Sequence, residues 1–165
     1  MNKKNLIFLD IDGVLATEED SWIPPHELYA YPFNPNCVRI FNAILKETNV
    51  KIVLSSDWRL IYHNDLVVLD EIFKYNNVIQ SPIDVTPNFI RDASNEVGGY
   101  IRMFNKNREK EITAYIERNF SEIDKFVILD DADLKIYSDN FVKCNINEGL
   151  KEEGIKEKII AILRG

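Results

Sequence analysis

Short apolar runs alternate along the chain with longer segments in which apolar residues recur every three or four positions. The run at 6–9 is apolar throughout and lies between polar Asn5 and Asp10, a pattern typical of a strand buried on both faces of a parallel sheet. Comparable runs predict four more strands, the last of them at an edge of the sheet, at 51–55, 78–80, 126–129 and 141–144.

Helical periodicity fills the intervals between these runs. Asn34 fits an N-cap and Pro35 the first helical position of a helix that reaches about Thr48. Further apolar stripes predict helices at 64–75, at about 108–120 and from 155 to the last residues. The alternation favours an α/β fold, a three-layer Rossmann-like arrangement with a mostly parallel five-stranded sheet and helices on both faces.

Length and composition fit one folded domain, covering residues 1–165. The chain carries 20 basic and 27 acidic residues, and the net charge of -7 argues against general coating of nucleic acid or binding to an anionic membrane. No apolar run approaches membrane-spanning length, and no cleavable signal precedes the first strand, so the cytoplasm is the expected location. Cys37 and Cys144 lack zinc-site spacing and fit reduced thiols.

The end of the first strand carries two carboxylates. Asp10 and Asp12 are two positions apart, so continued extended backbone would point both side chains to one side, and Gly13 then allows a sharp turn. Two like charges about 4 Å apart repel by about 4 kcal/mol at an effective dielectric constant of about 20. Either a proton or a cation is then needed between them, unless both are simply solvated turn residues.

Other polar residues follow the other predicted strands. Parallel strands present their carboxyl ends at one edge, where open α/β sheets bind ligands. That edge is therefore expected to collect Asp10, Asp12, Ser55, Asp130, Asp131 and the nearby Asp133. Oxygen ligands without neighbouring His or Cys favour Mg²⁺, and an ionised carboxylate beside such an ion suits phosphoryl transfer.

These segments resemble the motifs of a known superfamily. The stretches 9–15, 53–55 and 130–133 are similar, in order and in strand context, to motifs one, two and four of the haloacid dehalogenase (HAD) superfamily of phosphatases. The stretches 54–59, 86–87, 108–112, 127–133 and 149–150 further resemble the small capless branch found in RNA-repair proteins, which is related to the phosphatase half of polynucleotide kinase phosphatases.

The resemblance implies a role for each matching residue. Asp10 would be the nucleophile that forms an aspartyl phosphate, and Asp12 would be the general acid and base whose backbone carbonyl also helps to hold Mg²⁺. Ser55 would bind a phosphoryl oxygen. Asp131 would complete the metal site with Asp10, and Asp130 would orient the basic residue of motif three or a metal-bound water.

The basic residue of motif three stays open at this level. Arg108 fits the start of the predicted helix, and Lys106 and Lys110 are close alternatives. A glycine is usual near this point in the family, and Glu109 stands instead. At least two of these three cations are expected to face solvent.

Residues that follow the second strand are candidate substrate contacts. Ser56 belongs to the matching stretch, Arg59 would clamp a phosphate, and Trp58 would stack on a base or close the pocket. The alternatives are that Trp58 is a core residue and that Arg59 pairs with Asp57.

The substrate is expected to be large. Segments 16–35 and 81–107 are predicted to be active-site loops, and neither is long enough for a large cap domain, so the edge should be open. An open edge suits a Mg²⁺-dependent phosphomonoesterase that acts on a polynucleotide 3'-phosphate or a nucleotide. Phosphoprotein and metabolite substrates remain alternatives, as do a receiver domain, a metal-dependent nuclease and a non-catalytic phosphate-binding module.

Overall fold

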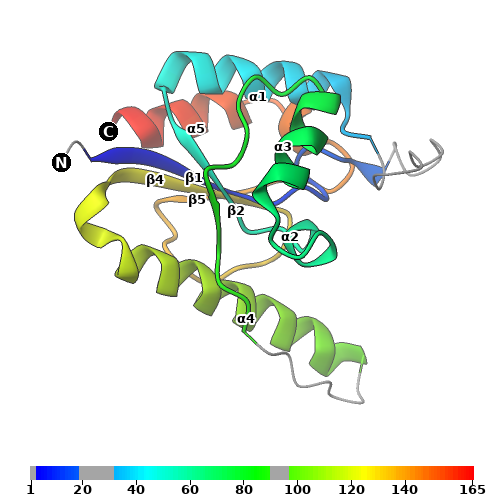
Figure 1. Cartoon of the computed structure of the whole chain (residues 1–165), viewed down its shortest axis with the longest axis vertical. Helices are drawn as coiled ribbons and strands as arrows, with labels where there is room; N and C mark the ends of the chain where they lie inside the picture. Colours follow the sequence, from blue (N-terminus) through cyan, green and yellow to red (C-terminus); the bar gives the residue numbers. More distant parts are fainter. Residues whose placement is uncertain (1–2, 19–31, 90–96) are drawn as a thin grey trace.

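The sheet is the centre of the fold. In the computed structural model, which describes residues 3–18, 32–89 and 97–165, five strands pair in the order β3-β2-β1-β4-β5. All four pairings are parallel (Figure 1). The strands are β1 (Lys4–Leu9), β2 (Lys51–Leu54), β3 (Asp84–Val85), β4 (Ile123–Asp130) and β5 (Phe141–Lys143). The predicted α/β fold with five strands is confirmed.

Helices cover both faces of this sheet (Figure 1). Ile7 and Leu9 of β1 pack in one cluster with α1 (Pro35–Thr48), α3 (Leu66–Tyr75) and α5 (Ile155–Arg164). Leu6 and Phe8 point to the other face, where they pack with Ile112 and other residues of α4 (Val97–Arg118). This alternation is the period of two expected of a strand buried on both faces.

Short helical segments complete the described chain, and none of them forms a separate cap. They are α2 (Trp58–Ile61) and the 3₁₀ turns η2 (Phe120–Glu122) and η3 (Gly149–Lys151). Within the described ranges, no helix is both long and apolar enough to cross a membrane.

Helix α1 begins and ends as its sequence predicts. The Asn34 side chain accepts hydrogen bonds from the backbone N–H groups of Asn36 and Cys37, and Pro35 occupies the first turn. Asn49 ends the helix with a left-handed backbone (φ 50°), and its N–H donates to the carbonyl of Leu45.

Two predicted elements were wrong. The segment 78–80 is not a strand: Val78 donates its N–H to Phe73 at the end of α3, and Ile79 is 52% exposed. The third strand is the two-residue β3 instead. Segment 81–107 is not a loop throughout, because α4 begins at Val97 and not near 108. Residues 19–31 and 90–96, with most of the predicted loop 16–35, lie outside the described residues.

Candidate active site

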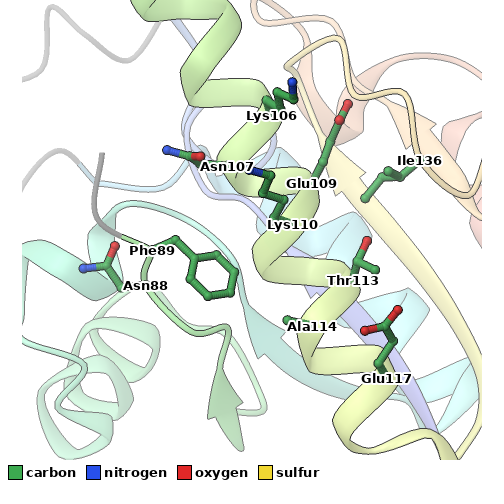
Figure 2. A pocket seen from close by; sticks show the side chains of 10 residues that line it. All are labelled: Asn88, Phe89, Lys106, Asn107, Glu109, Lys110, Thr113, Ala114, Glu117 and Ile136. Atoms are coloured by element: carbon green, nitrogen blue, oxygen red, sulfur yellow. The ribbon is translucent and has the colours of Figure 1, made fainter. Parts of the chain in front are cut away.

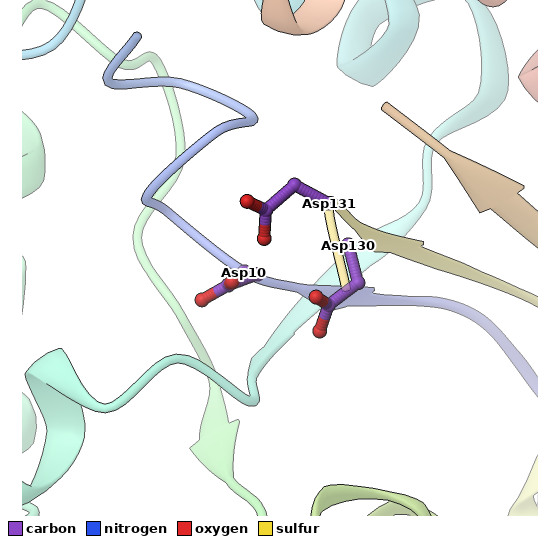
Figure 3. A group of neighbouring side chains, drawn as sticks. All are labelled: Asp10, Asp130 and Asp131. Atoms are coloured by element: carbon purple, nitrogen blue, oxygen red, sulfur yellow. The ribbon is translucent and has the colours of Figure 1, made fainter. Parts of the chain in front are cut away.

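Three carboxylates meet at the carboxyl edge of the sheet (Figure 3). Asp10 follows β1 and donates its backbone N–H to the carbonyl of Leu129, and Asp130 and Asp131 stand at the end of β4. One oxygen of each carboxylate lies within 4.8 Å of the others. The structure therefore brings together three of the acidic residues that the strand ends predict.

The turn after β1 lies directly against this cluster. Gly13 has a positive φ of 72°, and its N–H donates to the carbonyl of Ala16 over 2.7 Å. A Cβ built on Gly13 would lie only 2.6 Å from the Cβ of Asp131. Only glycine fits this position, because any side chain would both strain the backbone and displace an acidic residue of the cluster.

Arg108 reaches the cluster from α4 and links three carboxylates. Its Nη1 lies 2.8 Å from Oδ2 of Asp10 and 2.9 Å from Oδ2 of Asp130, and its Nη2 lies 3.3 Å from Oδ1 of Asp57. Burial disfavours the charged guanidinium, but these carboxylates outweigh burial and raise the pKa of Arg108 above its ordinary value. A permanent positive charge is thus held against Asp10.

The acidic residues keep protons more readily than free carboxylic acids do. Burial, reinforced by the charge of Asp10, raises the pKa of both Asp130 and Asp131. For Asp130, the ion pair with Arg108 and a 2.8 Å hydrogen bond from the backbone N–H of Ala132 act in the opposite direction. The whole cluster has more negative charge than Arg108 alone balances.

Asp12 lies close enough to the cluster for the charges of Asp10, Asp131 and Arg108 to act on its pKa. The residue as a whole is exposed, yet its carboxylate lies deep enough that desolvation, followed by the charge of Asp10, raises its pKa to about 6. The indole Nε1–H of Trp58 donates to Oδ2 of Asp12 over 3.0 Å, which lowers the pKa in part and fixes the carboxylate. Such a group can exchange a proton near neutral pH.

Ser55 lies at the end of β2, beside Asp10. Its backbone N–H donates to the carbonyl of Leu9 over 2.9 Å, and the residue is fully buried. Its Oγ has no hydrogen-bond partner among the described residues. An unsatisfied buried hydroxyl costs about 1–3 kcal/mol, so a ligand oxygen that bonds it would gain that energy.

Arg59 follows Ser55 by four positions, but its guanidinium pairs with carboxylates other than the three of the cluster. It is fully buried and pairs with Oε2 of Glu111 over 2.6 Å. Its Nη1 also donates to the carbonyls of Ser55 and Ser56 over 2.7 and 2.8 Å, and Asp57 lies 3.8 Å away. The expected phosphate clamp does not fit this placement, because the donors are already used within the protein.

Trp58 and Ser56 are buried as well. Trp58 is 3% exposed, and its ring packs against Phe33 and Tyr62 with centroids 5.6 and 6.2 Å away. Ser56 is fully buried, and its Oγ accepts a 3.4 Å hydrogen bond from the backbone N–H of Trp58. The core alternative for Trp58 therefore describes its placement better than base stacking does.

Of the motif-three candidates, only Arg108 contacts the acidic cluster. Lys106 and Lys110 are exposed on α4. Asp133 is also exposed and pairs with Lys135 and Lys143 at 2.7 and 3.6 Å, away from the three clustered carboxylates. The expectation that two of the three cations face solvent agrees with these positions.

The residues fit a hard divalent cation. The three carboxylates supply only oxygen donors, as Mg²⁺ prefers, and their mutual repulsion favours a cation between them. Both oxygens of Asp130 already accept hydrogen bonds, one from Arg108 and one from Ala132. Asp10 and Asp131 are consequently the two residues best able to bind an ion directly.

Glu111 was missed by the sequence reasoning, and Asp57 was considered only as a partner of Arg59. Glu111 is an acidic residue on the apolar, sheet-facing side of α4, one position before buried Ile112. A charge at that position was the available signal, since a buried carboxylate needs a buried cation as its partner.

A comparison with protein families decides the affiliation. The family model described as the HAD domain in Swiss Army Knife RNA repair proteins matches residues 6–155. The chain belongs to this family. The matched range includes Asp10, Asp130 and Asp131, the three residues of the acidic cluster. Neither curated proteins nor solved structures gave a match to the chain.

Proposed function

We propose that this HAD domain is a Mg²⁺-dependent phosphomonoesterase that works through an aspartyl phosphate on Asp10. The carrying observation is the position of the Asp10 carboxylate, which is held at the sheet edge by Arg108 and lies beside Asp130 and Asp131. Membership in a superfamily whose members are usually phosphohydrolases supports the same reaction.

In the first step, an Asp10 oxygen attacks phosphorus and the bond from phosphorus to the substrate oxygen breaks. Asp12 gives its proton to the departing oxygen, so that the product leaves as an alcohol. A pKa of about 6 allows Asp12 to hold that proton in part of the population near neutral pH. Trp58 keeps the Asp12 carboxylate in place for the transfer.

In the second step, water attacks the phosphorus of the aspartyl phosphate while Asp12 takes a proton from it. The bond between phosphorus and Asp10 breaks, and inorganic phosphate leaves. Arg108 and the Ser55 hydroxyl would stabilise phosphoryl oxygens in both steps; the contact of Arg108 with Asp10 and the unpartnered Ser55 Oγ support these roles. Bound Mg²⁺ would neutralise charge on the phosphoryl group, held by Asp10, Asp131 and the Asp12 carbonyl.

The leading substrate is a polynucleotide 3'-phosphate, with a nucleotide as the smaller variant of the same class. The described residues form no cap over the carboxyl edge, so a phosphate on a large molecule can approach. Membership in a family of RNA-repair HAD domains supports an RNA end. A phosphoprotein or a small metabolite would require the same chemistry on another leaving group.

Phosphate release tests the proposal. We expect the purified chain to release phosphate from a 3'-phosphorylated oligoribonucleotide with Mg²⁺ and not with EDTA. The Asp10→Asn variant should lose about 1,000-fold or more in kcat, since nucleophile removal abolishes the covalent route. Asp124→Asn is the matched control, because Asp124 is exposed at the opposite end of β4.

Three results would contradict parts of this proposal. Full activity in Asp10→Asn would indicate a route without a covalent aspartate, such as that of a metal-dependent nuclease. Activity on sugar phosphates alone would overturn the substrate class. Absence of both turnover and Mg²⁺ binding would leave a non-catalytic phosphate-binding module.

A further inference from the structure

A cavity of about 940 Å³ lies along α4, and none of the residues that line it belongs to the acidic cluster (Figure 2). Asn88 and Phe89, which follow β3, line one side of it, and Ile136, which follows β4, lines the other. Between them, α4 contributes residues that recur at three- and four-residue intervals and so share one face of the helix. Arg108 belongs to the opposite, sheet-facing side of the same helix.

The charges along this groove are unevenly placed. Lys106 and Lys110 are exposed one turn apart, and neither makes an ion pair with another described residue. Glu109 is engaged by the backbone N–H of Lys135, and Glu117 lies two turns beyond Lys110. The basic end of the groove is therefore its N-terminal end on α4, which is level with Arg108 along the helix axis but on the opposite side of the helix.

Phe89 offers an aromatic surface next to these lysines. The side chain is 39% exposed, and its ring points towards α4 (Figure 2). Its backbone N–H donates to Oε1 of Glu111 over 3.0 Å, and Glu111 is the partner of Arg59. A buried ion pair thus fixes the backbone that carries an exposed aromatic ring.

A second cavity, of about 510 Å³, continues from Phe89 and adds a polar surface. Thr86 lines it, and the Thr86 Oγ1 is buried without a hydrogen-bond partner among the described residues. Arg118 lines the same cavity and adds a positive charge. This cavity thus combines an aromatic residue, a threonine and a cation, which suits a ligand that has both a flat apolar face and polar groups.

We propose, on the basis of the proposed function, that this groove binds the single-stranded RNA whose terminal phosphate enters the active site. A base stacks on Phe89, and backbone phosphates lie at Lys106 and Lys110. Alternating stacking surfaces and cations suit single-stranded nucleic acid, because every base has a stacking face and every linkage a negative charge. The net charge of -7 restricts such binding to a local site.

Fluorescence anisotropy with a labelled, 3'-phosphorylated, single-stranded oligoribonucleotide tests the groove, using Asp10→Asn protein with Mg²⁺ to prevent turnover. Adding Phe89→Ala should raise Kd about fivefold or more, since base stacking on an aromatic ring is lost. Phe120→Ala is the matched control, because Phe120 is 73% exposed and lies in η2, outside the groove residues. It should leave Kd unchanged.

The lysines are tested through the salt dependence of the same binding. Lys106→Ala/Lys110→Ala should weaken binding and reduce the slope of log K against log salt by about 1.4, at about 0.7 for each lost phosphate contact. The control pair Lys46→Ala/Lys158→Ala lies on α1 and α5, which cover the other face of the sheet. That pair should keep the wild-type slope.

The proposal is overturned if the groove variants bind the RNA with the same Kd as their controls. It is also overturned if Phe89→Ala weakens the binding of a phosphopeptide as much as it weakens the binding of the RNA. In the active protein, the groove variants should lower kcat/KM for the oligoribonucleotide more than for p-nitrophenyl phosphate. An equal loss on both substrates would also contradict it. If the wild-type chain hydrolyses neither substrate, the proposed function fails, and the binding data still decide the groove.

Discussion

Two buried arginines in the same half of the molecule have opposite surroundings. Arg59 has one close carboxylate, that of Glu111, and spends its other donors on backbone carbonyls. Arg108 shares its charge among Asp10, Asp130 and Asp57. Burial outweighs the ion pair at Arg59 and lowers its pKa, whereas the three carboxylates raise the pKa of Arg108.

This difference indicates a structural role for Arg59 and a role in the candidate active site for Arg108. The charge of Arg59 is balanced by its own partner, so the pair joins the segment after β2 to α4 and to the segment after β3. The cluster around Arg108 keeps an excess of negative charge, which a metal ion would neutralise. A buried arginine with one carboxylate is typical of a structural ion pair, and an arginine among several carboxylates is typical of a candidate functional site.

The largest expected effect is the loss of activity on substitution of Arg108. Arg108→Gln removes the cation beside Asp10, and we expect kcat/KM for a 3'-phosphorylated oligoribonucleotide to fall about 100- to 1,000-fold. Arg108→Lys keeps one positive charge without the forked geometry and should recover part of that loss. Steady-state kinetics check both variants. Wild-type activity in Arg108→Gln would contradict the role of Arg108 in the active site.

Substitution of Arg59 should change the stability of the fold more than it changes the catalytic rate. Arg59→Met leaves Glu111 buried and unpaired, so the free energy of unfolding should fall by about 3–5 kcal/mol. Arg59→Met/Glu111→Leu removes both charges and should restore most of the loss, a difference that urea denaturation measures. If the double variant is no more stable than the single one, the ion pair is not what makes Arg59 necessary.

Trp58 adds to the comparison of the two arginines a neutral side chain that donates a hydrogen bond to Asp12. Trp58→Phe removes the hydrogen bond to Asp12. We expect kcat to fall about tenfold, which corresponds to an activation free energy higher by about 1.4 kcal/mol. That hydrogen bond lowers the pKa of Asp12, so its removal should move the limb of the pH–rate profile that Asp12 sets to higher pH. Tyr62→Phe, next to the indole ring, serves as the control and should keep the wild-type profile.

The smallest expected effect is the pH dependence of stability in the metal-free protein. The folded protein raises the pKa of Asp12 from 3.8 to about 6, so it retains a proton that the unfolded chain has already lost. Stability should therefore fall as the pH rises from 3.8 to about 6, and Asp130 and Asp131 act in the same direction. Asp70 and Asp133 have lowered pKa values, so their contributions are lost only below this window.

Thermal unfolding at pH 5 and pH 7.5 with EDTA measures this effect, with about 2–4 °C expected for each kcal/mol. Mg²⁺ should raise the midpoint most at pH 7.5, where the carboxylates are ionised. A midpoint that is equal at both pH values in wild type and in Asp12→Asn would show that burial of Asp12 does not strain the folded state.

Sequence reasoning reached the acidic cluster because its signals are local. Asp10 and Asp130 each follow an apolar run, and parallel strands bring such ends together whatever the loops between them do. The predicted start of α1 was confirmed for a similar reason, since Asn34 caps residues only two and three positions away.

Other features had no local signal. The strand β3 has only two residues, of which Asp84 is exposed, so it has no apolar run from which a strand could be predicted. The segment 81–107 was predicted to be a loop and contains Gly98 and Gly99, but glycine lowers helix stability by only about 1 kcal/mol per residue and does not forbid the first turn of α4. Arg59 and Glu111 are 52 positions apart, and only the packing of α4 on the sheet brings them together.

A structure with Mg²⁺ and beryllofluoride bound tests the central claim most directly, since beryllofluoride on a carboxylate imitates an aspartyl phosphate. We predict that beryllium is bonded to Asp10, with Mg²⁺ bound by Asp10 and Asp131 and with Arg108 and the Ser55 hydroxyl hydrogen-bonded to fluorine. Beryllofluoride on another residue, or Mg²⁺ away from these carboxylates, would contradict the account.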